Sequence, residues 1–165
     1  MKYALMIRND ALSKETALKI KEGLKDFFMY DDQNPDLVIS IGGDGTILEA
    51  VHHYLNKDCC FVGIHTGTLG FYTDYQVDQV DQFIKDVTSR EFTTMKRYLL
   101  EIKVNKKNQS ETYYALNELR LDQGLQAQVI HVYINDVLFE VFRGNGLCVS
   151  TPSGSTAYNK SLGGA

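Results

Sequence analysis

The sequence predicts a chain of two parts, an α/β part followed by an all-β part. In residues 1–92, apolar β-branched runs alternate with segments of helical spacing, which is the pattern of a Rossmann-like parallel sheet. In residues 93–165, single apolar residues alternate with polar ones, as in antiparallel strands with one wet face. We therefore expect an α/β nucleotide-binding domain at 1–92 and a β-rich domain at 93–165.

The first strand is expected at 2–8, "KYALMIR", and the first helix follows it. Ser13 is a plausible N-cap for that helix, because its hydroxyl can accept a hydrogen bond from a free backbone N–H. Apolar residues then recur at helical spacing, which predicts a buried helix face. They are Ala17, Ile20, Leu24 and Phe27.

Two more strands of the α/β part are each followed by a predicted helix. The runs "DLVISI" (36–41) and "CFVGI" (60–64) show little alternation, as expected for strands covered on both faces. The helix after the first run is expected from about Thr46, and the last helix spans Val77 to Val87. Strand and helix alternate throughout, which predicts a doubly wound sheet.

The second part reads as antiparallel strands joined by turns. The strands are expected in "LLEIKV" (99–104), "ETYYALNELRL" (111–121), "VIHVYI" (129–134) and "VLFEVF" (137–142). The last two flank "ND" and so form a hairpin. So few strands would leave edges unpaired and an apolar face open. We therefore expect an incomplete antiparallel β-sandwich.

Composition narrows the class of partner. The 165 residues carry a net charge of −4 without a long basic run, so neither a nucleic-acid nor a membrane-surface partner is indicated. No apolar run approaches the roughly 20 residues of a membrane helix, and no export signal is recognisable, so a cytoplasmic location is expected. The spacing of Cys59, Cys60 and Cys148 fits no zinc pattern, which indicates buried free thiols and no metal site.

The segment "GGDGT" follows the strand at 36–41 and has the make-up of a phosphate loop. Its glycines, Gly42, Gly43 and Gly45, allow positive φ and leave no side chains in the way of a ligand. Thr46 can cap the next helix, whose free N–H groups would face a phosphate. Asp44 would repel phosphate, so it would hold a bridging metal or accept a proton from an attacking hydroxyl. The alternative is a tight structural turn in which Asp44 caps the helix.

Three further segments carry polar or aromatic residues suited to a ligand. In "GIHTGTLGFY" (63–72), Leu69 and Phe71 can form an apolar wall for a planar ring, while His65 is better explained as a structural hydrogen-bonding group. In "ALNELRL", the Asn117 amide can pair with an adenine edge and the Glu118 carboxylate can accept from a ribose hydroxyl. Strand-end polar residues that simply face water are the alternative for this pair.

Two segments near the end of the sequence complete the candidate site. In "FRGNG" (142–146), Arg143 can hold a phosphate or a carboxylate through two hydrogen bonds. The segment "TPSGSTAYNKS" (151–161) is rich in hydroxyl groups that can bind a polar ligand. Ser153 lacks the GxSxG frame of a hydrolase nucleophile, so acyl transfer is rejected.

Taken in order, these segments resemble the NAD kinases of the bacterial type, from "GGDGT" to "TPSGSTAY". GGDGT alone also occurs in lipid kinases, whereas the NE pair with TPSGSTAY is far more selective. The resemblance implies transfer of the ATP γ-phosphoryl group, or that of polyphosphate, to the 2′-hydroxyl of the adenosine ribose of NAD. It also implies Mg²⁺ entering with ATP, and a homodimer or homotetramer.

The resemblance assigns roles to individual residues. Asp44 would take the hydroxyl proton, and Gly45 would let the backbone approach the dinucleotide. The other positions implied to bind NAD are Leu69, Phe71, Asn117, Glu118, Arg143, Asn145, Thr156, Ala157, Tyr158 and Ser161. Asn145 departs from the family, since many relatives have Asp there, and we expect altered affinity without lost function.

Two alternatives to an NAD kinase remain open at this point. Family chains continue well past "SLGGA", so the sequence also fits a truncated fragment that binds NAD or a nucleotide without turnover. The GGDGT segment also fits a lipid-type kinase, which would need an apolar acceptor pocket.

Overall fold

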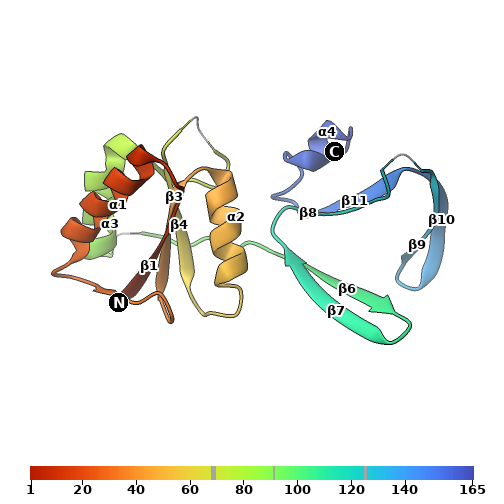
Figure 1. The fold of residues 1–165 in the computed structure, drawn as a ribbon, viewed down its shortest axis with the longest axis horizontal. Helices are drawn as coiled ribbons and strands as arrows, with labels where there is room; N and C mark the ends of the chain where they lie inside the picture. Colours follow the sequence, from red (N-terminus) through yellow and green to blue (C-terminus); the bar gives the residue numbers. More distant parts are fainter. Residues whose placement is uncertain (68–69, 91, 125) are drawn as a thin grey trace. The chain divides into compact units, whose positions relative to one another are not determined.

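The computed structural model describes residues 1–67, 70–90, 92–124 and 126–165, and they form two compact units. The first unit is Met1–Met95 and the second is Lys96–Ala165 (Figure 1). This division lies close to the predicted change of pattern at 92/93.

The first unit is built on a parallel sheet of five strands in the order β2-β1-β3-β4-β5. The strands are β1 (Lys2–Ile7), β2 (Met29–Tyr30), β3 (Leu37–Gly42), β4 (Cys60–His65) and β5 (Tyr75–Gln76). Ile39 in the middle of β3 pairs with Leu5 on one side and Val62 on the other. The predicted parallel sheet is therefore confirmed.

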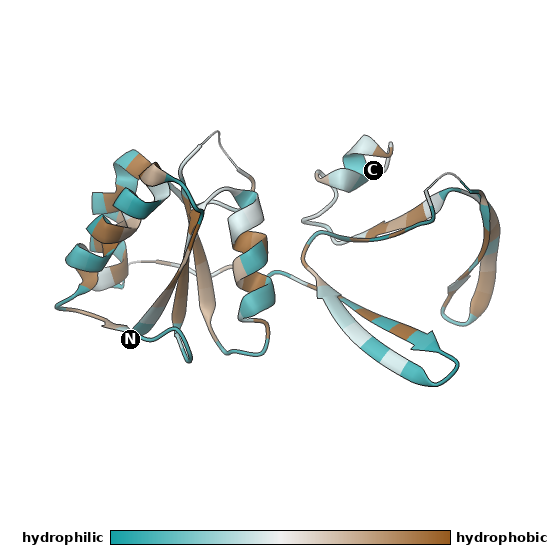
Figure 2. Cartoon of the chain, in the orientation of Figure 1, coloured by the Kyte–Doolittle hydropathy of each residue, from teal (hydrophilic) through white to brown (hydrophobic). Residues whose placement is uncertain are grey.

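Helices cover both faces of this sheet. They are α1 (Ala11–Leu24), α2 (Asp44–His53) and α3 (Val80–Ser89), the last preceded by the short 3₁₀ helix η1 (Val77–Gln79). Ile39 packs with Ile20 of α1 and Phe83 of α3, whereas its neighbour Val38 packs with Ala50 of α2. Since successive side chains of a strand point to opposite faces, α1 and α3 lie on one face and α2 on the other (Figures 1 and 2).

The first helix begins earlier than the sequence suggested. Its N-cap is Asp10, whose carboxylate Oδ1 accepts the Ser13 N–H at 2.9 Å, while Ser13 is buried in the first turn. Phe27 was also placed wrongly on the buried face. The helix ends at Leu24, so Phe27 is exposed and Phe28 takes its place in the core.

The second unit consists of antiparallel strands and one short helix. The elements are β6 (Leu100–Lys106), β7 (Gln109–Ala115), β8 (Glu118–Asp122), β9 (Gln128–Ile134), β10 (Val137–Gly144), β11 (Gly146–Ser150) and α4 (Tyr158–Ser161). The ladders are β6·β7, β8·β11 and β9·β10, each of two strands. In the β9–β10 turn, Asn135 and Asp136 have φ of 49° and 63°, as a primed hairpin turn requires.

The predicted antiparallel strands are confirmed, and the described strands do not close into a sandwich, in line with the expectation of an incomplete one. Large apolar side chains of β9 and β10 stay exposed, among them Phe139 at 68% and Tyr133 at 58%. These strands are apolar along much of their length (Figure 2). A sandwich needs a second sheet against that face, and none of the three ladders is large enough to bury its own.

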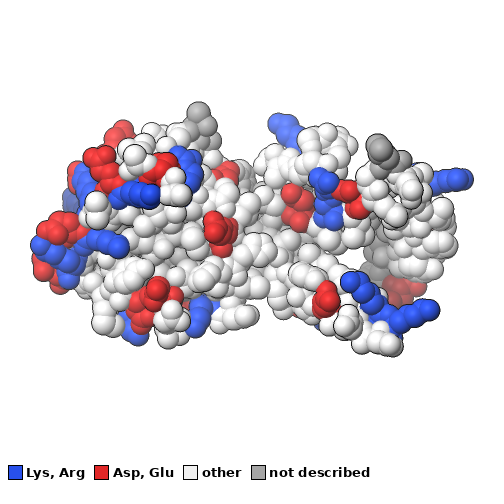
Figure 3. Space-filling model, in the orientation of Figure 1, with Lys and Arg blue, Asp and Glu red and all other residues white. Residues whose placement is uncertain are grey.

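The surface carries acidic and basic side chains in mixture on the face shown in Figure 3. Among the described residues, every helix is too short or too polar to cross a lipid bilayer. The cysteines are free thiols as expected, but the expectation that they are buried is wrong, since Cys59 and Cys148 are partly exposed and Cys60 is exposed.

Candidate functional site

The GGDGT segment lies where the sheet of the first unit changes its winding direction. The helix that follows β1 covers one face, and the helix that follows the adjacent strand β3 covers the other. Open α/β sheets bind ligands at the carboxyl ends of strands flanking such a switch point. Gly42 ends β3, and α2 starts two residues later.

The local conformation of this segment corrects two expectations. Helix α2 begins at Asp44 with Gly43 as its N-cap, so Thr46 is a buried residue of the first turn and not the cap. In the described chain, positive φ among glycines occurs at Gly124 and Gly163, and not in GGDGT.

The glycines of GGDGT serve two different purposes. A Cβ on Gly42 would lie 2.1 Å from Thr46 Oγ1, so this glycine is needed for packing. A Cβ on Gly43 or Gly45 would meet nothing within 4 Å. These two positions therefore leave open space beside the first turn of α2, where backbone N–H groups lack partners within the helix.

The Asp44 carboxylate is held in place by the segment that follows β4. Its Oδ2 accepts the Phe71 N–H at 2.8 Å and its Oδ1 accepts the Tyr72 N–H at 2.9 Å. A Cβ on Gly70 would come within 2.4 Å of Oδ1, so glycine is required for this approach. Asp44 is partly exposed. Its carboxylate is therefore fixed in orientation and still reachable from solvent.

The other predicted residues of this segment have clear positions, except Leu69, which lies outside the described residues. His65 is buried, and its Nδ1 accepts the Gly67 N–H at 2.8 Å, which supports the structural explanation for this histidine. The Phe71 ring is half exposed and packs edge-to-face on Tyr72 with 5.0 Å between centroids. The structure thus brings Asp44 and Phe71 together within the first unit.

In the second unit, the 151–157 segment folds back on the turn before β8. The Thr151 N–H donates to the Asn117 carbonyl at 2.8 Å, and its hydroxyl donates to the Leu116 carbonyl at 2.6 Å. Gly154 approaches the same turn so closely that a Cβ would lie 2.1 Å from the Asn117 oxygen. The NE pair and the TPSGSTAY segment are therefore one structural element.

Glu118 opens β8 beside this element and has an unsatisfied carboxylate oxygen. Its Oε2 is buried and has no hydrogen-bond partner among the described residues. Burial raises the pKa of the Cys148 thiol, and the negative charge of the nearby Glu118 raises it further. Burying a carboxylate oxygen without a hydrogen-bond partner costs free energy. Glu118 is therefore well suited to accept a hydrogen bond from a ligand hydroxyl.

A hollow of about 540 Å³ lies beside strands β8 and β11. Asn145 and Tyr158, two predicted ligand residues, line it together with Arg120 and Leu162. The Arg120 guanidinium lies 5.0 Å from the centre of the Tyr158 ring and also pairs with Asp122. Arg120 was missed in the sequence, although it sits two residues after Glu118 and so on the same face of its strand.

The remaining predicted residues of the second unit are spread over its surface. Arg143 on β10 and Thr156 are exposed, and Ala157 is partly buried. The Ser161 hydroxyl donates to the Tyr158 carbonyl at 2.7 Å, at the end of α4. They share the unit with Tyr158, but their contacts alone do not define a site.

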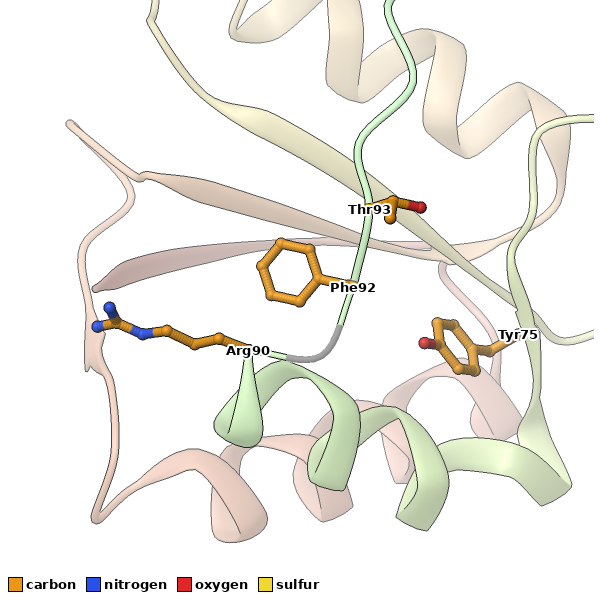
Figure 4. Close-up of a pocket in the computed structure, with 4 residues that line it drawn as sticks. All are labelled: Tyr75, Arg90, Phe92 and Thr93. Atoms are coloured by element: carbon orange, nitrogen blue, oxygen red, sulfur yellow. The ribbon is translucent and has the colours of Figure 1, made fainter.

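A second hollow, of about 580 Å³, belongs to the first unit and contains none of the predicted site residues. It is lined by Tyr75, Arg90, Phe92 and Thr93, with Arg90 extending away from Tyr75 (Figure 4). Burial, with a hydrogen bond to Asp86, raises the pKa of Tyr75 to about 12. Its hydroxyl therefore stays protonated in any ordinary buffer and is not suited to act as a base.

Metal ligands do not gather anywhere in the described residues. Nowhere there do three or more His, Cys, Asp or Glu side chains come close enough to hold an ion.

The α/β unit, with its glycine-rich segment at the switch point, falls in the class of nucleotide-binding α/β proteins. Residues 6–92 match the ATP-NAD kinase N-terminal domain and residues 116–165 match the ATP-NAD kinase C-terminal domain. The chain therefore belongs to the ATP-NAD kinase family. This membership sets aside the lipid-type kinase.

Relatives named NAD kinase are similar to this chain along its whole length. It is 45% identical over 170 residues to NAD kinase 1 of Bacillus anthracis, and 46% identical over 169 residues to the NAD kinase of Lysinibacillus sphaericus. In both comparisons all of this chain is covered, and the chain spans 64% of the length of the relative.

Solved structures share the fold. Yeast NADH kinase complexed with NADH matches with a TM-score of 0.87 at 21% identity, covering 100% of this chain and 61% of that one. An NAD kinase from Archaeoglobus fulgidus in complex with ATP matches with a TM-score of 0.78 at 25% identity, covering 100% and 66%. The two-part architecture is therefore that of NAD(H) kinases.

Proposed function

We propose that this chain provides the nucleotide-binding part of an NAD kinase that makes NADP from NAD and ATP. Its support is the family membership, together with relatives named NAD kinase that are 45% identical over the full chain. The observation that carries the proposal is the Asp44 carboxylate, oriented by two N–H groups beside the open positions Gly43 and Gly45.

The proposed reaction is a single displacement at phosphorus. The 2′-oxygen of the adenosine ribose of NAD attacks the γ-phosphorus of ATP, while the bond from that phosphorus to the β–γ bridging oxygen breaks. ADP leaves, and the hydroxyl proton passes to Asp44. Each carboxylate oxygen can accept more than one hydrogen bond, so the N–H contacts of Asp44 leave capacity for the hydroxyl.

We assign recognition of NAD to residues of the second unit. In the first unit, Phe71 keeps its proposed role as an apolar wall for a planar ring. The unsatisfied oxygen of Glu118 would accept a hydrogen bond from a ribose hydroxyl, and the Tyr158 ring would stack against a ring of the ligand. Asn145 would hydrogen-bond to the ligand as a neutral amide. In the first unit, the positions that keep a proposed ligand-binding role are Gly42, Gly45 and Thr46. In the second unit they are Asn117, Arg143, Thr156, Ala157 and Ser161.

Several finer features belong to the same proposal. Mg²⁺ would enter with ATP and be held chiefly by its phosphates, because no cluster of three ligating side chains exists in the described part of the chain. Its charge would offset that of the transferred phosphoryl group. Polyphosphate is the alternative donor, a homodimer or homotetramer the proposed assembly, and the cytoplasm the proposed location.

The test is NADP formation from NAD, ATP and Mg²⁺ by the 165-residue chain, with Asp44→Asn beside it. Loss of a general base typically lowers turnover by about 10² to 10⁴-fold, and NAD affinity by calorimetry should hardly change. Asp74→Asn is the matched control, because Asp74 also accepts a backbone N–H, that of Gly63 at 2.9 Å. Its turnover should stay near the wild-type value.

Each other outcome has a definite meaning. Equal turnover in Asp44→Asn would remove the proton-acceptor role. Saturable NAD binding without product, and without any effect of Asp44→Asn, would support the alternative of a non-catalytic NAD-binding fragment. Failure of the wild-type chain to bind NAD would overturn the proposed function.

A further inference from the structure

The proposed transfer needs positive charge at the phosphates of the donor, and Asp44 has the opposite sign. Enzymes that transfer phosphoryl groups stabilise the developing charge with Lys, Arg or metal ions. No basic residue of the first unit was predicted to take this part. A strong candidate at the carboxyl edge of the sheet is Arg8, directly after β1.

Arg8 lies where the ends of three neighbouring strands meet. Its N–H donates to the Ile41 carbonyl of β3 at 2.9 Å. A Cβ on Gly42 would lie 3.0 Å from the Arg8 Cβ, and a Cβ on Gly67 would lie 3.8 Å from its Nη1. Arg8 therefore lies against the first glycine of GGDGT and against the segment after β4, at the switch point between β1 and β3.

The Arg8 side chain is held by hydrogen bonds that occupy only some of its N–H donors. Its Nε donates to Asp10 Oδ2 at 2.6 Å and its Nη2 lies 3.4 Å from the Thr66 carbonyl. Nη1 has no hydrogen bond among the described residues, and the side chain is 46% exposed. A guanidinium has five N–H donors, so most of them remain available to phosphate oxygens.

The partner of Arg8 is itself anchored to the first turn of α1. Asp10 accepts the Ser13 N–H and its hydroxyl, and the Ser13 hydroxyl bonds to the buried Thr66 hydroxyl at 2.8 Å. The Arg8 hydrogen bond and these contacts hold the pKa of Asp10 at about 2. Asp10 thus orients the guanidinium as a fixed carboxylate, from the side of α1.

Four lysines of this unit are less suited. Lys2 pairs with Asp31 and begins β1, and Lys57 bonds to Asn34 and precedes β4, so both lie at the amino edge of the sheet. Lys19 and Lys25 pair with carboxylates along helix surfaces.

We infer that Arg8 binds the phosphate groups of the triphosphate donor, beside GGDGT. This inference rests on the proposed function. It adds to that function the residue that supplies positive charge to the phosphates of the donor. Arg8 acts as a binding residue for the donor, and the acceptor NAD depends on it less.

The test is calorimetric titration of the 165-residue chain with Mg-ATP and, separately, with NAD. Arg8→Gln should weaken ATP binding at least about tenfold, because hydrogen bonds to charged groups are strong. Arg8→Lys should lose less, since the charge remains without the two-pronged geometry. Asp10→Asn keeps a good helix cap and an amide oxygen that can still accept the Arg8 Nε–H and so orient the guanidinium. Because it removes only the competing charge, ATP affinity should be equal or higher.

Lys57→Gln is the matched control, since it removes the same charge at the opposite edge of the sheet and should leave both affinities unchanged. Circular dichroism melting of each variant checks folding. Equal losses of ATP and NAD affinity in Arg8→Gln, or unchanged ATP affinity, would overturn the inference while NADP formation by the wild type would still support the proposed function. A wild-type chain that binds NAD and not ATP would overturn the donor site itself.

Discussion

The strands of the two units are buried to very different extents, although both units contain strongly apolar strands. In the first unit β3 is buried along its whole length, because helices of the same unit cover both faces of the sheet. In the second unit Val137 and Phe139 of β10 are each 68% exposed. A parallel sheet with its crossover helices completes its own core, whereas a two-stranded ladder needs a surface supplied from elsewhere.

The two units also differ in the functional groups that we propose for them. The candidate base, Asp44, and the candidate phosphate-binding Arg8 belong to the self-contained unit, where neighbouring strand ends fix their positions. Most candidate NAD-binding groups belong to the open unit, on turns and short ladders. The reacting groups thus have the firmer support.

The largest effect is expected from a matched pair of phenylalanines. Phe83→Ala removes a ring that is 2% exposed and packs on Tyr75, and it should lower the free energy of unfolding by about 3–5 kcal/mol. Phe139→Ala should change it by no more than about 0.5 kcal/mol. Urea unfolding followed by circular dichroism measures both. Similar losses in the two variants would show that the apolar face of β10 is covered in solution, and would break the comparison.

A second pair separates packing from ligand approach within GGDGT. Gly42→Ala should destabilise the fold by about 1–3 kcal/mol, because its Cβ would collide with Thr46. Gly45→Ala lies in an open part of the first turn of α2 and should stabilise the fold by about 0.5–1 kcal/mol. The same variant should bind NAD more weakly in calorimetry. If Gly45→Ala binds NAD as tightly as the wild type, the dinucleotide does not approach the backbone at Gly45.

The third prediction concerns ligand binding in the open unit and a smaller effect than the loss of Phe83. Tyr158→Ala removes a ring that lies beside Arg120 in the hollow, and it should weaken NAD binding by about 1–2 kcal/mol. ATP binding should change less. Calorimetry with both ligands decides this, and an unchanged affinity for NAD would count against a role for this segment in NAD binding.

Much of the fold follows from local patterns in the sequence. The unbroken apolar run around Ile39 predicted a strand covered on both faces, and the alternation around Ile102 predicted an antiparallel strand. The Asn135–Asp136 turn was equally clear. Such patterns depend on the period of the side chains, which a strand or helix sets by itself.

Helix starts were less certain, because several residues compete to cap a helix. Asp10 caps α1 instead of Ser13, and Gly43 caps α2 instead of Thr46. In both helices the chain turns helical earlier than the side-chain hydroxyl suggested, and the hydroxyl residue is buried in the first turn.

The sequence by itself determined the order of the main strands and helices, the change from parallel to antiparallel strands, and Asp44 as a candidate functional residue. It did not predict the strands β2, β5 and β11, or the break between β7 and β8. Only the tertiary structure decided that the carboxylate of Asp44 is held by the N–H groups of Phe71 and Tyr72, and that Arg8 lies against Gly42 and Gly67. The physical reason is distance along the chain. Periodicity and capping act over a few residues, whereas these contacts join strand ends dozens of residues apart, and only the packed sheet brings them together.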